Sequence, residues 1–269
     1  MPIVSKPSEF ACPLCFAFFD SSILLANGGT LPTKEDLAHF VRSDQAAHWL
    51  AERGISFSYS AMSLASSDAP HGFYFTPLRQ YLFEHPDVAP FAARAASLLV
   101  WREGFRFCPA CGGRLVDDDE QTAARCPHCK RQHFPRIEPA TITLVSRGDE
   151  ILLVKNRNAA RSYFACVSGF VEAGESAEQC VVREVKEETA LVVKNVRYVA
   201  SQAWPFPDQL MLAFRAEWES GEIAIQHEEI TEAAWFRRDN LPPPDEMPRE
   251  GSVAWRLING KFASTNKND

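Results

Sequence analysis

The chain has 269 residues, 46% of them hydrophobic, so it is long enough to bury the core of one large domain or two ordinary ones. Its 35 acidic and 28 basic residues give a formal charge of -7, which disfavours non-specific binding to long nucleic acid. No stretch approaches the ~20 apolar residues that span a bilayer, and no secretory segment stands at the start. We therefore expect a soluble cytoplasmic protein without a membrane partner.

Residues 1–104 carry aromatic and aliphatic segments between turn-forming residues, which predicts several strands. The run "VAPFAARAASLLVWREGF" (88–105) predicts a helix, and "TKEDLAHFVRSDQAAHWLAERG" (33–54) also has helical spacing and ends in glycine. This part is expected to be a small α/β region, and its pattern alone indicates no function. Cys12 and Cys15 in "CPLC" are expected to be free thiols, with a zinc half-site or a redox pair as alternatives.

Two further cysteine pairs, "CPAC" and "CPHC", stand fourteen residues apart. Two tight turns of this kind can each offer two sulfurs about 2.3 Å from one zinc ion, while a reducing cytosol disfavours disulfides. A four-thiolate site has no open coordination position, so this zinc is expected to stabilise the fold and to perform no chemistry. His128 and His133 are expected to be ordinary surface histidines. The predicted zinc ligands are Cys108, Cys111, Cys126 and Cys129.

The C-terminal part alternates strands with one clear helix. "ATITLVS" (140–146) and "EILLVKN" (150–156) are separated by "RGD", which predicts a hairpin. "SYFACVSGF" (162–170) precedes the helix, and "LVVKNVRYVASQAW" (191–204) and "LMLAFRAEW" (210–218) follow it as further strands. The most economical assembly is a mixed sheet flanked by helices.

Three glutamates lie on one face of the predicted helix in "GFVEAGESAEQCVVREVKEETAL" (169–191). Glu184, Glu187 and Glu188 are spaced i, i+3 and i+4, so their carboxylates fall within about 100° of one another. Their repulsion, roughly 0.2 to 0.5 kcal/mol per pair, is too small to decide between a solvated acidic face and a functional one.

The rest of this stretch favours function. Glycines permit sharp turns before the helix, Ser176 supplies an N-terminal acceptor, and Val181, Val182 and Val185 form an apolar flank. The order Gly, five residues, Glu, seven residues, Arg-Glu-apolar-any-Glu-Glu resembles the box of the Nudix hydrolases. Ala190 stands where that family usually has glycine, in a loop where a positive φ would suit alanine poorly. The matching residues are Gly169, Glu175, Arg183, Glu184, Val185, Glu187, Glu188 and Leu191.

Ten residues past the box, "SQAWPFPDQL" (201–210) resembles the SQPWPFPxS signature of the NADH pyrophosphatase branch of that family, with Ala203 and Gln209 as departures. A Trp and a Phe held between prolines make a rigid wall for a flat heterocycle, although the segment alone is typical of an aromatic turn in a core. The resemblance implies an α/β chain with a Nudix αβα sandwich, a four-cysteine zinc ribbon and an N-terminal α/β domain. The expected domains are 1–104, 105–137 and 138–269.

This resemblance implies hydrolysis of the pyrophosphate bond of NADH, and of NAD, to nicotinamide mononucleotide and AMP, with magnesium or manganese as the catalytic metal. Glu184, Glu187 and Glu188 are the expected catalytic residues. Glu184 and Glu188 would ligate the metal, and Glu187 would ligate it or accept the proton of the attacking water. Arg183 is expected to pair with Glu175 and brace the loop.

The resemblance adds further positions. Phe170 and Trp204 match rings that border the base, and Phe134 stands where the family often has a tyrosine from a partner subunit. Glu229 matches a distal metal ligand, although Glu228 could substitute for it. Arg79 and Ala254 are weaker correspondences, and Cys180 is expected to be a small buried hydrophobic residue. The expected metal ligands are Ser168 (through its carbonyl), Glu184, Glu188 and Glu229. The expected substrate contacts are Phe134, Phe170, Gln202, Trp204, Pro205, Phe206, Pro207 and Ala254.

Two alternatives remain open at this stage. The same chemistry could remove a 5′ NAD cap from RNA, although the net acidity favours a free, small-molecule dinucleotide. The chain could instead be a sensor that binds a nucleotide without cleaving it; no catalytic carboxylate is missing, and only Ala190 favours this. The family resemblance also implies a homodimer.

Overall fold

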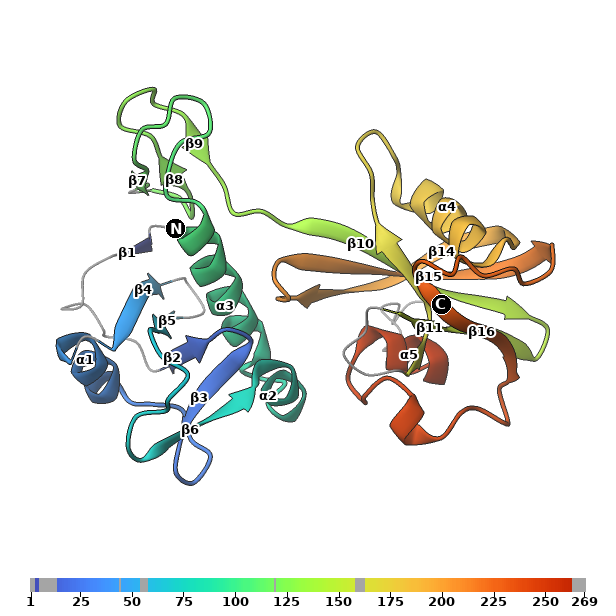
Figure 1. Cartoon of the computed structure of the whole chain (residues 1–269), viewed down its shortest axis with the longest axis horizontal. Coiled ribbons are helices and arrows are strands. Elements are labelled where there is room, and N and C mark those ends of the chain that lie inside the picture. Colours follow the sequence, from blue (N-terminus) through green and yellow to red (C-terminus); the bar gives the residue numbers. More distant parts are fainter. Residues whose placement is uncertain are drawn as a thin grey trace, which may run out of the picture. The chain divides into compact units, whose positions relative to one another are not determined.

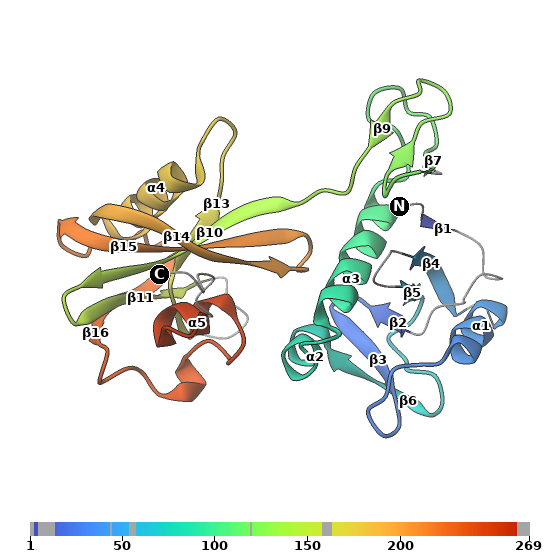
Figure 2. The same ribbon diagram turned by 180° about the vertical axis from the view of Figure 1, so that it is seen from behind.

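The computed structural model divides the chain into two compact units (Figures 1 and 2). The first comprises Met1–Arg136 together with Pro205–Asp208, and the second comprises Ile137–Trp204 and Gln209–Asp269. Cys12 lies outside the described residues. No helix among those residues is long and apolar enough to cross a membrane. The structure describes residues 3–4, 14–43, 45–53, 58–118, 120–157 and 163–262.

The first unit is built on a six-stranded sheet of order β1-β4-β5-β2-β3-β6. The expected helix over 88–105 is confirmed as α3, whose buried alanines and leucines pack against Phe16 and Tyr59 of the sheet. The strands are β1 Ile3–Val4, β2 Leu14–Phe19, β3 Ser22–Ala26, β4 Ala46–Arg53, β5 Ser58–Leu64 and β6 Phe73–Pro77, and the helices are α1 Lys34–Arg42, α2 Leu78–Glu84 and α3 Ala89–Gly104.

The prediction of one helix over 33–54 is wrong in its second half. Helix α1 begins at the capping box of Thr33 and ends at Ser43, whose backbone N–H and hydroxyl both donate to the His39 carbonyl. Residues 46–53 form β4, which pairs antiparallel with β5 along its length. The ladder with β5 outweighs the local helical spacing, because tertiary pairing overrides a weak propensity.

The cysteine-bearing segment lies in the first unit as a small three-stranded sheet, and Asp118 organises its turn. This carboxylate is 1% exposed; it accepts the N–H groups of Glu120 and Gln121 and side-chain hydrogen bonds from Arg125 and Gln132. These bonds, that from Gln132 first, hold the pKa of Asp118 well below its usual range. The strands are β7 Val116–Asp117, β8 Ala124–Arg125 and β9 Gln132–His133.

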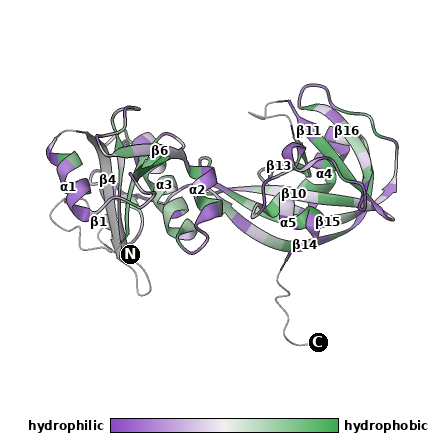
Figure 3. Ribbon diagram, turned by 90° about the horizontal axis from the view of Figure 1, so that it is seen from below, coloured by the Kyte–Doolittle hydropathy of each residue, from purple (hydrophilic) through white to green (hydrophobic). Residues whose placement is uncertain are grey.

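The second unit is the expected sandwich, a seven-stranded mixed sheet between two helices (Figures 1 and 3). Side chains alternate across the central strand: Leu144 packs on the α5 side and Val145 on the α4 side. The predicted hairpin over 140–156 is confirmed. The elements are β10 Glu138–Arg147, β11 Glu150–Asn156, β12 Phe164–Ala165, β13 Val167–Phe170, α4 Ala177–Thr189, β14 Val192–Trp204, β15 Gln209–Ser220, β16 Ile230–Arg237, η2 Pro244–Glu246 and α5 Val253–Asn259.

Helix α4 carries the acidic stretch and has defined ends. Ser176 is its N-cap, with a capping box to Gln179, and Val181 and Val185 are fully buried. The apolar flank is narrower than expected, because Val182 is 42% exposed. At the other end Ala190 has φ +60°, the left-handed conformation for which the family usually provides glycine.

Replacing Ala190 by glycine should therefore stabilise the second unit. Glycine adopts a positive φ without the clash that alanine suffers, and we expect a gain of about 0.5 to 1 kcal/mol in the free energy of unfolding. Urea denaturation followed by tryptophan fluorescence measures it. Ala177→Gly in the first turn of the same helix is the matched control and should lose stability. Equal destabilisation by both substitutions would contradict the assigned strain.

Candidate active site

The three glutamates of α4 share a face but differ in environment. Glu188 is 2% exposed and Glu184 9% exposed, whereas the side chain of Glu187 is 53% exposed. The carboxylate of Glu184 lies against the backbone of Gly169 in β13, and a Cβ atom at residue 169 would overlap it. Glycine is required at this position because the helix and the strand approach so closely.

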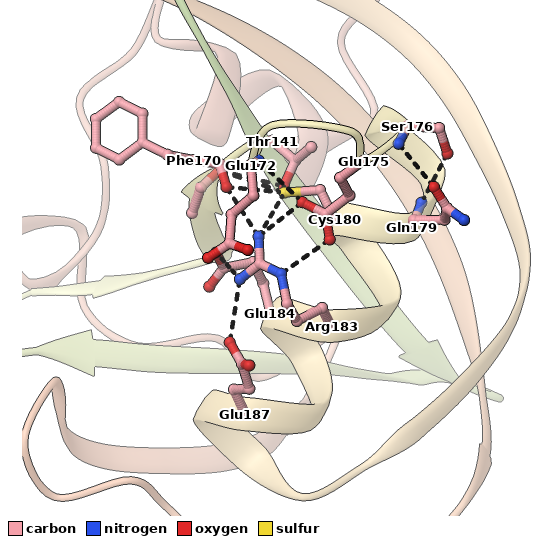
Figure 4. Close-up of polar contacts among 11 residues, drawn as sticks. Thr141, Phe170, Glu172, Glu175, Ser176, Gln179, Cys180, Arg183, Glu184 and Glu187 are labelled. Carbon is pink, nitrogen blue, oxygen red and sulfur yellow. Dashed lines mark hydrogen bonds and ion pairs between the residues drawn. The ribbon is translucent and has the colours of Figure 1, made fainter.

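Arg183 lies at the centre of an ion-pair network with three carboxylates (Figure 4). Its guanidinium contacts Glu175 through two bonds of 2.8 Å, Glu184 at 2.7 Å and Glu187 at 3.0 Å. It also donates to the Phe170 carbonyl at 2.9 Å, which ties the loop before α4 to the helix. These hydrogen bonds lower the pKa of Glu175 to about 2 and confirm the predicted bracing pair.

Glu188 has no such partner. Its Oε2 atom is buried and forms no hydrogen bond with any described residue. Burial first, and then the negative charges of Glu184, Glu229 and Glu187, raise the pKa of Glu188 to about 8. An orphaned carboxylate oxygen beside other carboxylates is the environment that a hard divalent cation would stabilise.

Glu229, which lies just before β16, acts electrostatically on the glutamates of α4. Its charge contributes to the raised pKa values of both Glu184 and Glu188, for which burial is the first cause. Among the described residues, no set of three or more carboxylates has ligand oxygens within 4.8 Å of one another. The acidic cluster is thus more open than a closed metal site.

The predicted substrate contacts Phe170 and Gln202 lie in one row across the sheet. Phe170 pairs with Ala140, Ala140 with Met211, and Met211 with Gln202. Three strand spacings separate the ends of this row, about 14 Å. The ring of Phe170 is 48% exposed and extends away from the guanidinium of Arg183 (Figure 4). Ser168, two residues before Phe170 in β13, lies on the same face of the sheet and pairs with Ile142.

The amide of Gln202 is engaged with the start of α5. Its Oε1 accepts the N–H of Val253 at 2.8 Å, and its Nε2 donates to the Gly251 carbonyl at 3.3 Å. These bonds fix the position of Ala254, the next residue of the helix, which is 8% exposed. Gln202 therefore orients α5 in this structure.

The turn Pro205–Asp208 belongs to the first unit. Phe206 packs against that unit's main core cluster, with the guanidinium of Arg79 5.4 Å from its ring centre. Ser97 donates to the Pro207 carbonyl at 3.1 Å. Pro205 is buried, Trp204 is half-buried, and Phe134, which precedes the end of the same unit, is 57% exposed.

The second candidate site is the cysteine cluster. Cys108, Cys111, Cys126 and Cys129 place their sulfurs within 4.8 Å of one another, as a four-thiolate zinc site requires. His128 is exposed as expected, but the expectation is wrong for His133, which is half-buried with Nε2 3.4 Å from Cys108 Sγ. Its ring also packs 5.3 Å from that of Phe105.

Comparison with known proteins finds a family model for each of the two segments that carry these sites. The model of the NUDIX domain matches residues 136–256, and that of the NADH pyrophosphatase zinc ribbon domain matches residues 105–134. A protein named NAD-capped RNA hydrolase NudC from Pseudomonas syringae pv. syringae is 45% identical over 202 residues, which are 74% of this chain and 71% of the relative. The chain belongs to the Nudix hydrolases, in their NADH pyrophosphatase branch.

Other relatives of this Nudix hydrolase carry the same name. That from Stutzerimonas stutzeri is 41% identical over 214 residues, covering 78% of this chain and 76% of the relative. That from Pseudomonas aeruginosa is 44% identical over 189 residues, or 70% of this chain, and the chain spans 66% of its length. Family membership supports structural zinc in the four-cysteine cluster and a divalent cation at the acidic one.

Some residues that shape the sites of this Nudix hydrolase were not found by sequence reasoning. Thr141 places its hydroxyl 3.3 Å from Cys180 Sγ beneath the box, and Cys180 is fully buried as expected, with its pKa raised by burial. Asp118 organises the zinc ribbon. The sequence gives no signal for either residue. Thr141 and Cys180 come from segments remote in the chain, and Asp118 lies in a turn of irregular backbone.

The stability of the magnesium-free enzyme should fall as pH rises. The pKa of Glu188 is about 8 in the folded state against an ordinary value of 4.5, so folding favours the protonated form. The contribution is complete below about pH 4.5 and is lost progressively up to about pH 8. Urea midpoints across this range, in magnesium-free buffer, measure the slope. Glu188→Gln should flatten it and Glu178→Gln should not; an unchanged slope in Glu188→Gln would refute the assignment.

The zinc content should depend on the four cysteines alone. Cys126→Ser should lose the metal, about one zinc per chain, and lower the thermal stability of the first unit, because a structural zinc site contributes folding free energy. Elemental analysis and thermal denaturation measure the two effects. Cys15→Ser, a buried cysteine of the main sheet of the same unit, is the control and should retain zinc. Zinc retained in Cys126→Ser would count against the four-thiolate site.

Proposed function

We propose that this chain hydrolyses the pyrophosphate bond of NADH, and of NAD, to nicotinamide mononucleotide and AMP. The observation that carries the proposal is a buried carboxylate oxygen of Glu188, which has no hydrogen-bond partner among the described residues, next to the charges of Glu184 and Glu229. A carboxylate in this environment is stabilised by a divalent cation, the group that pyrophosphate hydrolysis requires. Family membership and the names of the relatives support the same reaction.

The proposed ligands of magnesium or manganese are Glu184, Glu188, Glu229 and the carbonyl of Ser168. When bound, such a cation neutralises phosphoryl oxygens and lowers the pKa of a coordinated water. Glu187 is solvent-accessible and lies on the same helical face, so it can accept the proton of the attacking water. Arg183 holds Glu184 and Glu187 in place through its bonds at 2.7 and 3.0 Å.

The proposed contacts to the dinucleotide come from the row that crosses the sheet. Phe170 at one end has an exposed ring on which a base can stack, and Trp204 follows Gln202 at the other end. Ala254 lies beside this row because Gln202 fixes the start of α5. Pro205, Phe206 and Pro207 stiffen the adjoining turn, and Phe134 would act from a second subunit in a proposed homodimer. A reducing cytoplasm, which keeps thiolates available to zinc, is the proposed compartment.

Removal of a 5′ NAD cap from RNA is a second candidate, favoured by the names of the relatives. The bond cleaved in this substrate is the same as in NADH. A non-catalytic sensor is not favoured, because Glu184, Glu187 and Glu188 are all present and the acidic cluster has the orphaned oxygen of a cation site.

The purified chain should release nicotinamide mononucleotide and AMP from NADH when magnesium or manganese is present. Glu188→Gln should lower kcat/KM by about 100- to 1000-fold, because it removes charge from the cation site while keeping the side-chain volume. Chromatography with mass-spectrometric identification of both products measures this. Glu178→Gln, an exposed glutamate of the same helix, should keep native activity. No product from the native chain with either metal would overturn the proposal.

A further inference from the structure

Two arginines face one another on the α5 side of the second unit. Arg197 of β14 is the direct cross-strand partner of Arg215 of β15, and both are exposed. Arg215 also pairs with Leu144, whose side chain packs on the α5 side. Its Nη2 lies 4.0 Å from the position that a Cβ of Gly260, the C-cap of α5, would take.

No acid neutralises this pair within the described part of the chain: neither arginine forms an ion pair or a hydrogen bond there through its side chain. The next residue of β15 on the same face, Glu217, instead accepts a hydrogen bond from Asn195 at 2.9 Å. Like charges placed directly opposite on an antiparallel pair are destabilising. Their presence is unexpected in a chain whose formal charge is -7, where acids are abundant.

Two more cations lie at the same end of α5. Arg256 is one helical turn before Gly260, and its Nε is buried without a hydrogen-bond partner among the described residues. Its guanidinium lies 5.6 Å from the ring centre of Phe262. The backbone N–H of Lys261 donates to the Arg256 carbonyl, which keeps this residue beside the helix end. We call Arg197, Arg215, Arg256 and Lys261 the cationic seam.

The seam continues the face that carries the proposed dinucleotide contacts. The first residue of α5, Val253, donates its N–H to Gln202, and the C-cap of the helix, Gly260, lies beside Arg215. The helix therefore runs along β14 and β15 between these two residues (Figure 1). Met211 and Ala213 of β15 have their side chains on this same face, between the level of Gln202 and Arg215. The cross-strand partners of Gln202 and Arg197, Met211 and Arg215, are four residues apart on β15, about 14 Å along the strand, because a bulge adds one residue to β14 between them.

We propose that the cationic seam binds backbone phosphates of a single-stranded RNA whose 5′ end carries the dinucleotide. The inference rests on the second candidate function and extends it to the body of the RNA. Free NADH has no phosphodiester beyond its pyrophosphate, and the distance from Gln202 to the seam exceeds what one nucleotide spans. Guanidinium groups pair with phosphate oxygens through two parallel bonds, and the four cations, which form no ion pair among the described residues, make a surface that a flexible anionic chain can follow.

Direct binding tests the seam without any catalytic step. The probe is a fluorescent, unstructured oligoadenylate with a 5′-monophosphate, titrated with the full-length protein at several salt concentrations. The double variant Arg197→Glu, Arg215→Glu should bind more weakly, and its plot of log K against log salt should be shallower by about 1.4, because each single-strand phosphate contact contributes about 0.7. The control carries Lys34→Glu and Arg42→Glu on α1, which make the same charge change on exposed residues of the first unit.

Kinetics complete the test. With NAD-capped RNA the double variant should lose about tenfold in kcat/KM at low salt, while kcat/KM for NADH stays within about twofold of native. The α1 control should match the native chain on both substrates. Thermal denaturation of all three proteins checks that the sheet is intact.

Equal affinities and equal salt slopes for the native chain and the double variant would overturn the seam, even if NADH is hydrolysed normally. So would an equal loss in the α1 control, which would show only the effect of net charge. If the double variant alone loses RNA binding while the native chain hydrolyses no dinucleotide, the seam stands and the proposed function fails. The two proposals are therefore separable.

Discussion

Glu188 is buried with a carboxylate oxygen that has no hydrogen-bond partner in the described part of the chain, and the second unit is arranged around this constraint. An uncompensated charge in such a site costs several kcal/mol, so the folded chain holds either a proton or a cation there. The pKa of Glu188 is raised, first by burial, which favours the protonated side chain when no cation is bound. Gly169 allows β13 to approach closely enough for Glu184 to share the site, and its missing side chain is as necessary as the carboxylates themselves.

Arg183 explains why the site keeps its negative charge. One guanidinium contacts Glu175, Glu184 and Glu187, so it supplies a single positive charge to three acids and none to Glu188. The network therefore fixes the loop and the helix without neutralising the cluster. A second cation is still favoured, and its place is beside Glu188, which Arg183 does not contact.

Sequence periodicity was enough to predict α3, α4 and the strands β10, β11, β14 and β15 of the sandwich, because each has an apolar pattern that matches its own period. It indicated neither β16 nor α5. It failed for β4, where the backbone ladder with β5 outweighs helical spacing, and for Val182, which lies just beyond the buried stripe of α4. The spacing of the four cysteines predicted their cluster, since two tight turns fix the sulfurs locally. The contact of His133 with that cluster could not be predicted, because it depends on how β9 returns to Cys108.

The register of the sheet places the two halves of the proposed chemistry on opposite faces. Thr141 of β10 faces α4, where its hydroxyl meets Cys180, while its neighbour Ala140 lies in the row that joins Phe170 to Gln202 on the α5 side. Because the side-chain period of a strand is two, a shift of one residue would exchange these faces and place the ring-binding row beneath the carboxylates. A dinucleotide that contacts both the carboxylates and this row would therefore pass the end of β13, where position 169 faces α4 and the side chain of Phe170 faces the α5 side.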